Sequence, residues 1–538
     1  MASDRQTQEP LLPSQQPAQA EQGSAPEQEG DEAEHPLSHR LTGARLLIVS
    51  TAVLLLLVAC TFGLTYSYAA NRYFLSTAPP TCRKSAAAVI SSGLRLGEDE
   101  GSPRLKGKQL LVWSGKGHHA DLMFDDLRAF DLRTGGWHRL YDRTDNPNNK
   151  ARDPIGRWKA VAVFDESLPG LVISGGDAAS DGSESRKQKL PNKGFLNDIW
   201  WLPTNVSLPF WEQPALGSTP ALEADKHKHV VPSPRRAHAG SIFASPDRPT
   251  QLVIHGGKAP KGDELADVWT AHLTSAAFRW ERLYEPLNES EAGISYPAPR
   301  KGHIAVTIPG DDPLLFIWGG RNDTAYFGNA PWVFSLQSRQ WTHWLPSNPS
   351  SPSPGSRDHL GAFYYNGRVY IYGGRGGKDY VSSKPLNDIW AFDVAARTWS
   401  PVVTRGATPT ARFLYSMAFY TTGNDTTRGQ ASEDGRMVIF GGEGRDGCFY
   451  NDVHEFSLAA SKWRELSANR PCQKRCRGKH HHKSLRDHVW EDNELSAVDP
   501  FEEEPVRDQR SGANESWVPE TSVLELGITE MRQVLRQV

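Results

Sequence analysis

The sequence lacks the motifs by which the commonest metal- and nucleotide-dependent enzymes are identified. It has no His-Glu-x-x-His zinc motif and no glycine-rich loop that would hold a phosphate. Its net charge is only -3, so there is no electrostatic basis for binding nucleic acid. Cysteine is scarce, with five residues in 538. We therefore predict no cofactor, no metal and no nucleic-acid partner.

A recurring pattern of glycine pairs and single tryptophans fills most of the chain. Each pair ends a short apolar run, and a lone tryptophan follows it. The pairs are Ser114-Gly115, Gly175-Gly176, Gly256-Gly257, Gly319-Gly320, Gly373-Gly374 and Gly441-Gly442. The tryptophans are Trp137, Trp211, Trp280, Trp341, Trp399 and Trp463. Repeats of some tens of residues, each with several strand-like runs, indicate a stacked repeat architecture. We number the copies repeats 1 to 6.

Repeat 5 shows how one copy is built. Residues 360–365 form an apolar run, Asn366-Gly367 supplies a hairpin turn, and residues 368–372 form a second apolar run. Residues 386–393 alternate as a half-buried strand does, and a fourth strand begins at the closing tryptophan. A four-stranded sheet with two apolar faces cannot bury both alone. We therefore predict that the copies pack around an axis as a β-propeller.

This pattern resembles the kelch repeat, in which Arg precedes the first strand, a glycine pair follows the second, and an Asp-aromatic segment forms the third. Matching segments are Arg235-Arg236-Ala237-His238, Arg300-Lys301-Gly302-His303, Asn197-Asp198-Ile199-Trp200, Ala266-Asp267-Val268-Trp269, Asn387-Asp388-Ile389-Trp390 and Asn451-Asp452-Val453-His454. The resemblance implies an all-β fold, a six-bladed kelch-type β-propeller over residues 82–466. Repeat 4 departs from the pattern, because Asn329-Ala330-Pro331 replaces the usual Asp segment before Trp332.

An apolar run without charge covers residues 46–68. About 20 such residues span a bilayer as a helix. Aromatic residues gather at its C-terminal side, as they do at a membrane interface. We therefore predict an N-terminal single transmembrane helix that serves as a signal anchor. The alternative is a cleaved signal peptide with a site in the small residues 67–70, although the run is long and begins far into the chain.

All five N-glycosylation sequons follow the apolar run. Their acceptor residues are Asn205, Asn288, Asn322, Asn424 and Asn514. No sequon precedes the run, and the charges on its two sides are balanced. We therefore predict a single-pass glycoprotein of the secretory pathway or cell surface, with the propeller lumenal or extracellular. The lipid bilayer is then one partner, through residues 46–68.

The other segments carry no repeat. Residues 1–45 are rich in Gln, Glu, Ser, Pro and Ala, a composition that predicts a disordered N-terminal tail. Residues 69–81 are a short linker, and residues 467–520 are a charged, mostly disordered tail. In residues 521–538, apolar side chains recur on one face of a helix, which predicts a short amphipathic helix.

Four of the five cysteines follow the apolar run, namely Cys82, Cys448, Cys472 and Cys476. In an oxidising compartment an even set can pair. Cys82 precedes the first repeat and Cys472 and Cys476 follow the last, so a disulfide between the two ends would fasten the ring. Four cysteines permit three pairings, and the sequence does not choose among them. A zinc site formed with the histidines at 480–482 is disfavoured, because nearby lysines and arginines would repel a cation.

Long loops are expected on one face of the propeller. They are residues 177–195, 375–386 and 212–234. Binding residues concentrate on long loops over a rigid scaffold, so this face is the predicted site for a protein or glycan ligand. Arginines and tryptophans near the inner ends of the sheets are the candidate binding residues, namely Trp113, Trp318, Arg321, Arg375 and Arg445.

Two classes of function fit this pattern. The first is a membrane-tethered, non-catalytic module that binds protein or glycan, which analogy with the fold favours. The alternative is a carbohydrate-active enzyme on a kelch or galactose-oxidase-like propeller. The copper site of a galactose-oxidase-like propeller needs a cysteine crosslinked to tyrosine. No cysteine after the apolar run lies in the early repeats, which disfavours that activity. The histidines His238, His303 and His359 occupy a packing position of the repeat, so we assign them to structure and predict no catalytic residue.

Overall fold

The structure is a computed structural model, and it describes fifteen stretches of the chain. They are residues 78–92, 107–118, 123–142, 153–165, 168–178, 194–204, 211–216, 231–245, 248–274, 277–286, 295–328, 330–346, 350–377, 382–422 and 434–468. All belong to the first of two compact units, Met1–Lys479. Within these stretches no helix is long and apolar enough to cross a bilayer. The predicted span 46–68, the predicted N-terminal tail and residues 469–538 lie outside them, whereas Ser467, the first residue of the predicted charged tail, is the last residue of a strand.

Antiparallel meanders make up the first three repeats. Repeat 1 holds β1 (Ala87–Ser92), β2 (Lys108–Trp113), β3 (Asp126–Asp131) and β4 (Trp137–Asp142). Repeat 2 holds β5 (Val161–Asp165), β6 (Gly170–Asp177) and β7 (Phe195–Pro203), and a bridge from Trp201 to Glu212 stands in place of a fourth strand. Repeat 3 holds β9 (Ala239–Ser245), β10 (Arg248–Lys258), β11 (Glu264–Leu273) and β12 (Ala277–Tyr284), with β8 (Ala215–Leu216) parallel to β12.

The last three repeats follow the same order. Repeat 4 holds β13 (Lys301–Ile308), β14 (Leu314–Arg321), β15 (Trp332–Ser335) and β16 (Trp341–His343). Repeat 5 holds β18 (Gly361–Tyr365), β19 (Arg368–Tyr372), β22 (Ile389–Asp393) and β23 (Thr398–Val402). Repeat 6 holds β25 (Ser416–Thr422), β26 (Asp434–Phe440), β27 (Val453–Ser457) and β28 (Lys462–Ser467), with β24 (Arg405–Gly406) parallel to β28. A small sheet of β17 (Arg357–Asp358), β20 (Arg375–Gly376) and β21 (Lys384–Pro385) and one turn, η6 (Arg445–Gly447), complete the described elements.

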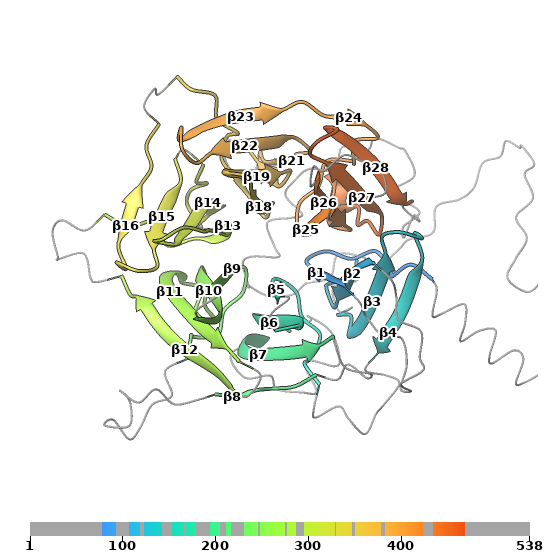
Figure 1. Cartoon of the computed structure of the whole chain (residues 1–538), viewed down its shortest axis with the longest axis horizontal. Helices are drawn as coiled ribbons and strands as arrows, with labels where there is room; N and C mark the ends of the chain where they lie inside the picture. The colour runs from blue at the N-terminus through green and yellow to red at the C-terminus, as the bar shows by residue number, and fades with distance from the viewer. Residues whose placement is uncertain are drawn as a thin grey trace, which may run out of the picture. The chain divides into compact units, whose positions relative to one another are not determined.

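The first strands of the repeats surround a common axis. β1, β5, β9, β13, β18 and β25 contact one another in this order, and β25 in turn contacts β1. Figure 1 shows the sheets following one another around this axis, each with its first strand innermost. The all-β prediction is confirmed, and so is the prediction that the copies pack around an axis.

Each junction between neighbouring sheets has its own hydrophobic cluster. Side chains of repeats 1 and 2 form one, and those of repeats 6 and 1 form another. Five of the six closing tryptophans are buried in these clusters, whereas Trp341 is only half-buried at the edge of the cluster between repeats 3 and 4. The clusters explain the repeat pattern, because neither face of a sheet is covered until the next sheet packs against it.

The glycine pairs lie where the chain entering the next repeat crosses the sheet. The N–H of Gly176 donates to the carbonyl of Arg235, with an N···O distance of 2.9 Å. The N–H of Gly257 donates in the same way to Arg300, also at 2.9 Å. A Cβ at Gly256 would lie 2.9 Å from that same carbonyl oxygen, so a side chain does not fit. Close approach of backbone, with a positive φ of 63°, therefore requires glycine here.

The same contact closes the ring between repeats 6 and 1. The N–H of Gly442 donates to the carbonyl of Arg83 at 2.9 Å, and Ser416 Oγ donates to the carbonyl of Ala86 at 2.6 Å. Trp137 packs edge-on against Phe440, with ring centroids 5.5 Å apart. Closure thus has a non-covalent basis that needs no strand exchange.

The predicted disulfide fastening stays a prediction. Cys82 is buried and immediately precedes Arg83. Cys448 lies in the same junction, two residues before Tyr450, whose carbonyl accepts a bond from the Arg83 N–H at 3.1 Å. Cys472 and Cys476 are outside the described residues.

Candidate functional site

A belt of left-handed residues surrounds the axis. In every repeat one arginine precedes the first strand, and we call it the entering arginine. The entering arginines are Arg83, Arg157, Arg235, Arg300, Arg357 and Arg412. The residue two positions after each of them has a positive φ. These residues are Ser85, Lys159, Ala237, Gly302, His359 and Leu414, with φ of 51°, 55°, 52°, 65°, 51° and 53°. Five of the six N–H groups donate to the carbonyl of the counterpart one repeat earlier. This series begins at the carbonyl of Lys159 and ends at the N–H of Ser85. This belt fixes the backbone that presents the neighbouring side chains to the axis.

Twelve side chains lie beside this belt, and we call them the axial ring. Six directly follow the entering arginines, and six directly follow the glycine pairs. They pair across the backbone as Lys84 with Lys116, Trp158 with Asp177, Arg236 with Lys258, Lys301 with Arg321, Asp358 with Arg375, and Phe413 with Glu443. Seven of the twelve are basic and three are acidic. These twelve side chains together therefore carry a net positive formal charge.

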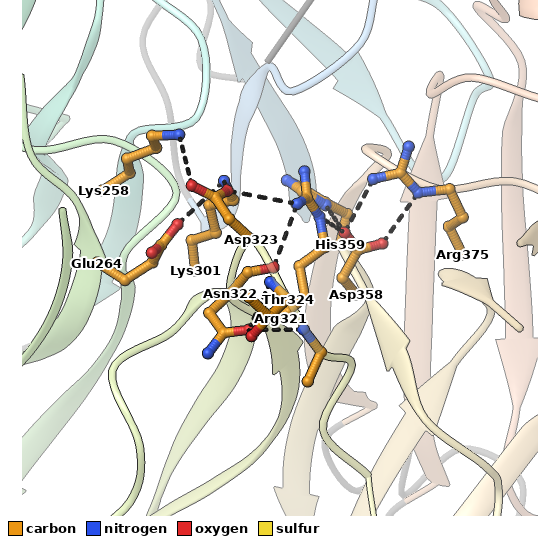
Figure 2. A network of polar contacts seen from close by, with 11 residues as sticks. Lys258, Glu264, Lys301, Arg321, Asn322, Asp323, Thr324, Asp358, His359 and Arg375 are labelled. Carbon is orange, nitrogen blue, oxygen red and sulfur yellow. Dashed lines mark hydrogen bonds and ion pairs between the residues drawn. The ribbon is translucent and has the colours of Figure 1, made fainter. Parts of the chain in front are cut away.

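Ion pairs fill the part of the axial ring contributed by repeats 3 to 5 (Figure 2). Asp323 lies 2.8 Å from Lys301 Nζ and 3.6 Å from Lys258 Nζ. Asp358 accepts from Arg321 Nε at 3.0 Å and from Arg375 Nη2 at 2.9 Å. Burial alone would raise the pKa of Asp358, but Arg375 and His359 outweigh it, and the pKa of this carboxyl falls well below its usual range.

Four cations converge on the indole ring of Trp158 in the part contributed by repeats 1 to 3. Lys159 Nζ lies 3.9 Å from the ring centroid, Lys116 Nζ 4.7 Å, Lys84 Nζ 5.5 Å and Arg236 Cζ 5.9 Å. We call these five residues the Trp158 cluster. An indole face attracts cations, and each such contact is worth about 0.5–2 kcal/mol.

Two carboxylates of the described residues pair with the Trp158 cluster. Glu443 lies 3.0 Å from Lys84 Nζ, and Asp177 lies 2.5 Å from Arg236 Nη1. Because Lys84 and Lys116 are buried, their charges are poorly screened by water. The cluster thus concentrates positive charge around one indole ring.

The predicted binding residues divide into three groups. Trp113 and Trp318 are completely buried and pack against Trp211 and Trp399, each with ring centroids 5.1 Å apart. In this structure they are core residues of the packing between sheets. Arg321 and Arg375 belong to the axial ring and share Asp358, which ties repeat 4 to repeat 5. Arg445 is exposed on η6.

Sequence reasoning missed the Trp158 cluster. Its members follow the entering arginine or the glycine pair at fixed offsets, and aligning the six repeats by these landmarks would have found them. Of the predicted glycosylation sites only Asn322 is described, and its Oδ1 accepts from Thr324 Oγ1 at 3.0 Å. Asn205, Asn288, Asn424 and Asn514 lie outside the described residues, as do residues 179–193 and 217–230 of the predicted long loops.

Buried histidines line the packing between repeats 3, 4 and 5. His238, His255, His303 and His359 are all buried or nearly so, and His255 Nδ1 lies 2.8 Å from His303 Nε2. Burial lowers the pKa of His238 and His255 to about 3 and that of His359 to about 4. The assignment of His238, His303 and His359 to structure agrees with their burial. In the described part of the chain no three side chains of the His, Cys, Asp and Glu types are grouped to hold a metal ion.

Comparison with known proteins gives two overlapping matches to one family model. Residues 221–418 and 287–490 each match the KLHDC2/KLHL20/DRC7 Kelch-repeats domain, and together they cover half of the chain. Kelch domain-containing protein 3 of Rattus norvegicus is 30% identical over 247 residues, which are 44% of this chain and 58% of that protein. The F-box/kelch-repeat protein At1g51550 of Arabidopsis thaliana is 28% identical over 292 residues, 52% of this chain and 54% of that protein. The chain thus spans little more than half the length of these relatives.

Proposed function

Because this chain belongs to the kelch-repeat family, we propose that residues 82–466 form a six-bladed propeller that works as a non-catalytic protein-binding module. The observation that carries the proposal is the Trp158 cluster, in which four cations meet one indole at the end of the axis where the repeats are entered. Arginine, lysine and aromatic side chains on a rigid ring suit recognition of an acidic segment of a partner. The carboxylates nearby are held in ion pairs, which supports binding rather than acid–base chemistry.

Neutralising two lysines of the cluster is expected to weaken partner binding without unfolding the domain. Lys116→Gln combined with Lys159→Asn removes two charges, and Asn tolerates the left-handed backbone at 159. We expect a loss of affinity of about tenfold or more, because each 1.4 kcal/mol corresponds to a factor of ten. Partners captured by the tagged full chain are identified by mass spectrometry, and their affinity for both forms is then measured by calorimetry.

The matched control is Lys462→Gln on β28, which removes an exposed lysine far from the cluster. It should leave the affinity unchanged. Equal affinity of the double variant and the wild type, with melting temperatures also equal, would show that the cluster is not the binding site. Turnover of free sugars by the purified chain would instead favour the carbohydrate-active alternative.

We further propose that the propeller is presented on the lumenal or extracellular side by a helix at residues 46–68. The uncharged run and the five sequons after it support this proposal. Endoglycosidase treatment of the chain expressed in a eukaryotic secretory system is expected to sharpen its gel band and lower its apparent mass. An unchanged band, or glycan on sequons engineered into residues 1–45, would contradict this topology.

A further inference from the structure

Each repeat is entered through a buried arginine, and in five of the six repeats this arginine makes the same three kinds of contact. In repeat 6, Arg412 Nε donates to the carbonyl of Thr410 at 2.9 Å, Nη1 donates to the carbonyl of Gly441 at 2.9 Å, and both Nη atoms donate to the carboxylate of Asp452. The same bidentate pair recurs in four other repeats. These pairs are Arg83–Asp126, Arg157–Asp198, Arg235–Asp267 and Arg357–Asp388.

Repeat 4 keeps the arginine and lacks the carboxylate. Arg300 Nε donates to the carbonyl of Ala298 at 2.9 Å, and Nη1 donates to the carbonyl of Gly319 at 3.2 Å. Its guanidinium lies 4.2 Å from the Phe327 ring centroid, as that of Arg83 lies over Phe124. The aspartate of the other repeats is replaced by Ala330, which stands two residues before Trp332 as Asp388 stands before Trp390.

A guanidinium that is 4% exposed and has no carboxylate of the described residues beside it is energetically costly. Burial without a compensating carboxylate lowers the pKa of Arg300 to about 10. The carboxylate position is open to solvent in repeats 2 and 5, where the side chains of Asp198 and Asp388 are 23% and 42% exposed, and nearly closed in repeats 1 and 6. In repeat 4 Ala330 is half-buried, so a small solute can approach this position from solvent.

We propose that the space beside Arg300 and Ala330 binds a carboxylate-sized monovalent anion, which takes the role that aspartate has in the other five repeats. The guanidinium fork matches a carboxylate in geometry, and Phe327 closes one side. The anion is either a free ion, such as chloride or formate, or the carboxylate of a bound molecule. This site belongs to repeat 4 and is distinct from the Trp158 cluster.

The test compares melting temperatures of the full chain in sodium formate, sodium chloride and sodium gluconate at equal ionic strength. Binding to the folded state alone stabilises it by mass action, so formate should raise the melting temperature by about 2 °C or more, in a saturable manner. N-acetylglutamate amide serves as the probe for a carboxylate on a larger molecule. A response to this probe but not to formate or chloride would assign the site to a bound molecule's carboxylate, and a response to formate would assign it to free ions.

Two variants make the test specific. Ala330→Asp supplies the missing carboxylate, so it should raise the melting temperature in gluconate and abolish the response to formate. Asparagine has nearly the same volume as aspartate but no charge, so Ala330→Asn should block the response to formate with a smaller gain in stability. Bromide soaked into crystals of the wild type should give an anomalous peak beside Arg300. An identical response to formate in the wild type and in Ala330→Asp, or no response to any anion and no bromide peak, would overturn the proposal.

Discussion

Replacing Asp452 by alanine is expected to lower the free energy of unfolding by about 3–5 kcal/mol, because it leaves the buried Arg412 without its counter-ion. The two Nη atoms of Arg412 donate to Asp452 at 2.6 and 2.8 Å. Burial tends to raise the pKa of Asp452, but the bonds from Arg412 outweigh it, and the pKa falls below its usual range. The pair also supports ring closure, because Arg412 Nη1 bonds the carbonyl of Gly441, which contacts repeat 1.

Repeat 5 provides the control for this prediction. Asp388→Ala breaks the same bidentate pair with Arg357, but the Asp388 side chain is 42% exposed against 7% for Asp452. Water can replace the lost carboxylate there, so we expect a loss less than half as large. Urea unfolding followed by tryptophan fluorescence measures both variants. Equal losses, or a loss below about 1 kcal/mol for Asp452→Ala, would show that these pairs do not stabilise the repeats as argued.

Acid is expected to destabilise the domain well above the pH at which its carboxylates titrate. The four buried histidines have pKa values below 6.5 in the folded chain, chiefly because burial penalises the charged ring. Between these values and 6.5 the unfolded chain binds more protons than the folded chain. The free energy of unfolding therefore rises with pH across this window, falls as pH is lowered through it, and is unaffected by these groups above pH 7. By pH 5 each histidine should remove about 1–2 kcal/mol.

The repeat itself supplies a matched variant. His238 packs on Gly257 as Leu360 packs on Gly374 in repeat 5, so His238→Leu uses a residue that the fold already accepts at this position. We expect this variant to reduce the loss of stability between pH 7 and pH 5, as measured by urea unfolding at each pH. His272→Gln alters a histidine of the same repeat that is about one-third exposed, and it serves as the substitution control. A slope equal to that of the wild type in His238→Leu would exclude this histidine as a source of acid sensitivity.

The sequence predicted the parts of the fold that depend on residue type. Gly257 and Trp399 have counterparts in other repeats, because close backbone contact and packing between sheets each accept few types of side chain. Such positions are recognised when the repeats are compared with one another. The axial ring was harder to find, because the residues after the entering arginines include Lys84, Trp158 and Asp358 and share only an offset. Trp113 was assigned to a ligand site because inner-strand aromatics look alike in sequence whether they face the axis or the next sheet.

Closure of the ring depended on information that the side-chain pattern does not carry. The bond from Gly442 to Arg83 joins two backbone groups more than three hundred residues apart, and no residue type marks it. The missing carboxylate of repeat 4, in contrast, was visible as Ala330, but its consequence for Arg300 appeared only once the contacts of the other arginines were known.

Because the last repeat meets the first through the same contacts as any other pair, the order of the repeats is cyclic. An open array such as an ankyrin or leucine-rich stack needs capping units and can lengthen by one copy at either end. A closed ring has no such ends. Losing any one repeat breaks two junctions at once, and adding one demands a different curvature at every other junction. Such a domain can change by substitution of one repeat for another at the same position in the ring. A circular permutation that places the chain ends at a different junction would keep every contact of the ring.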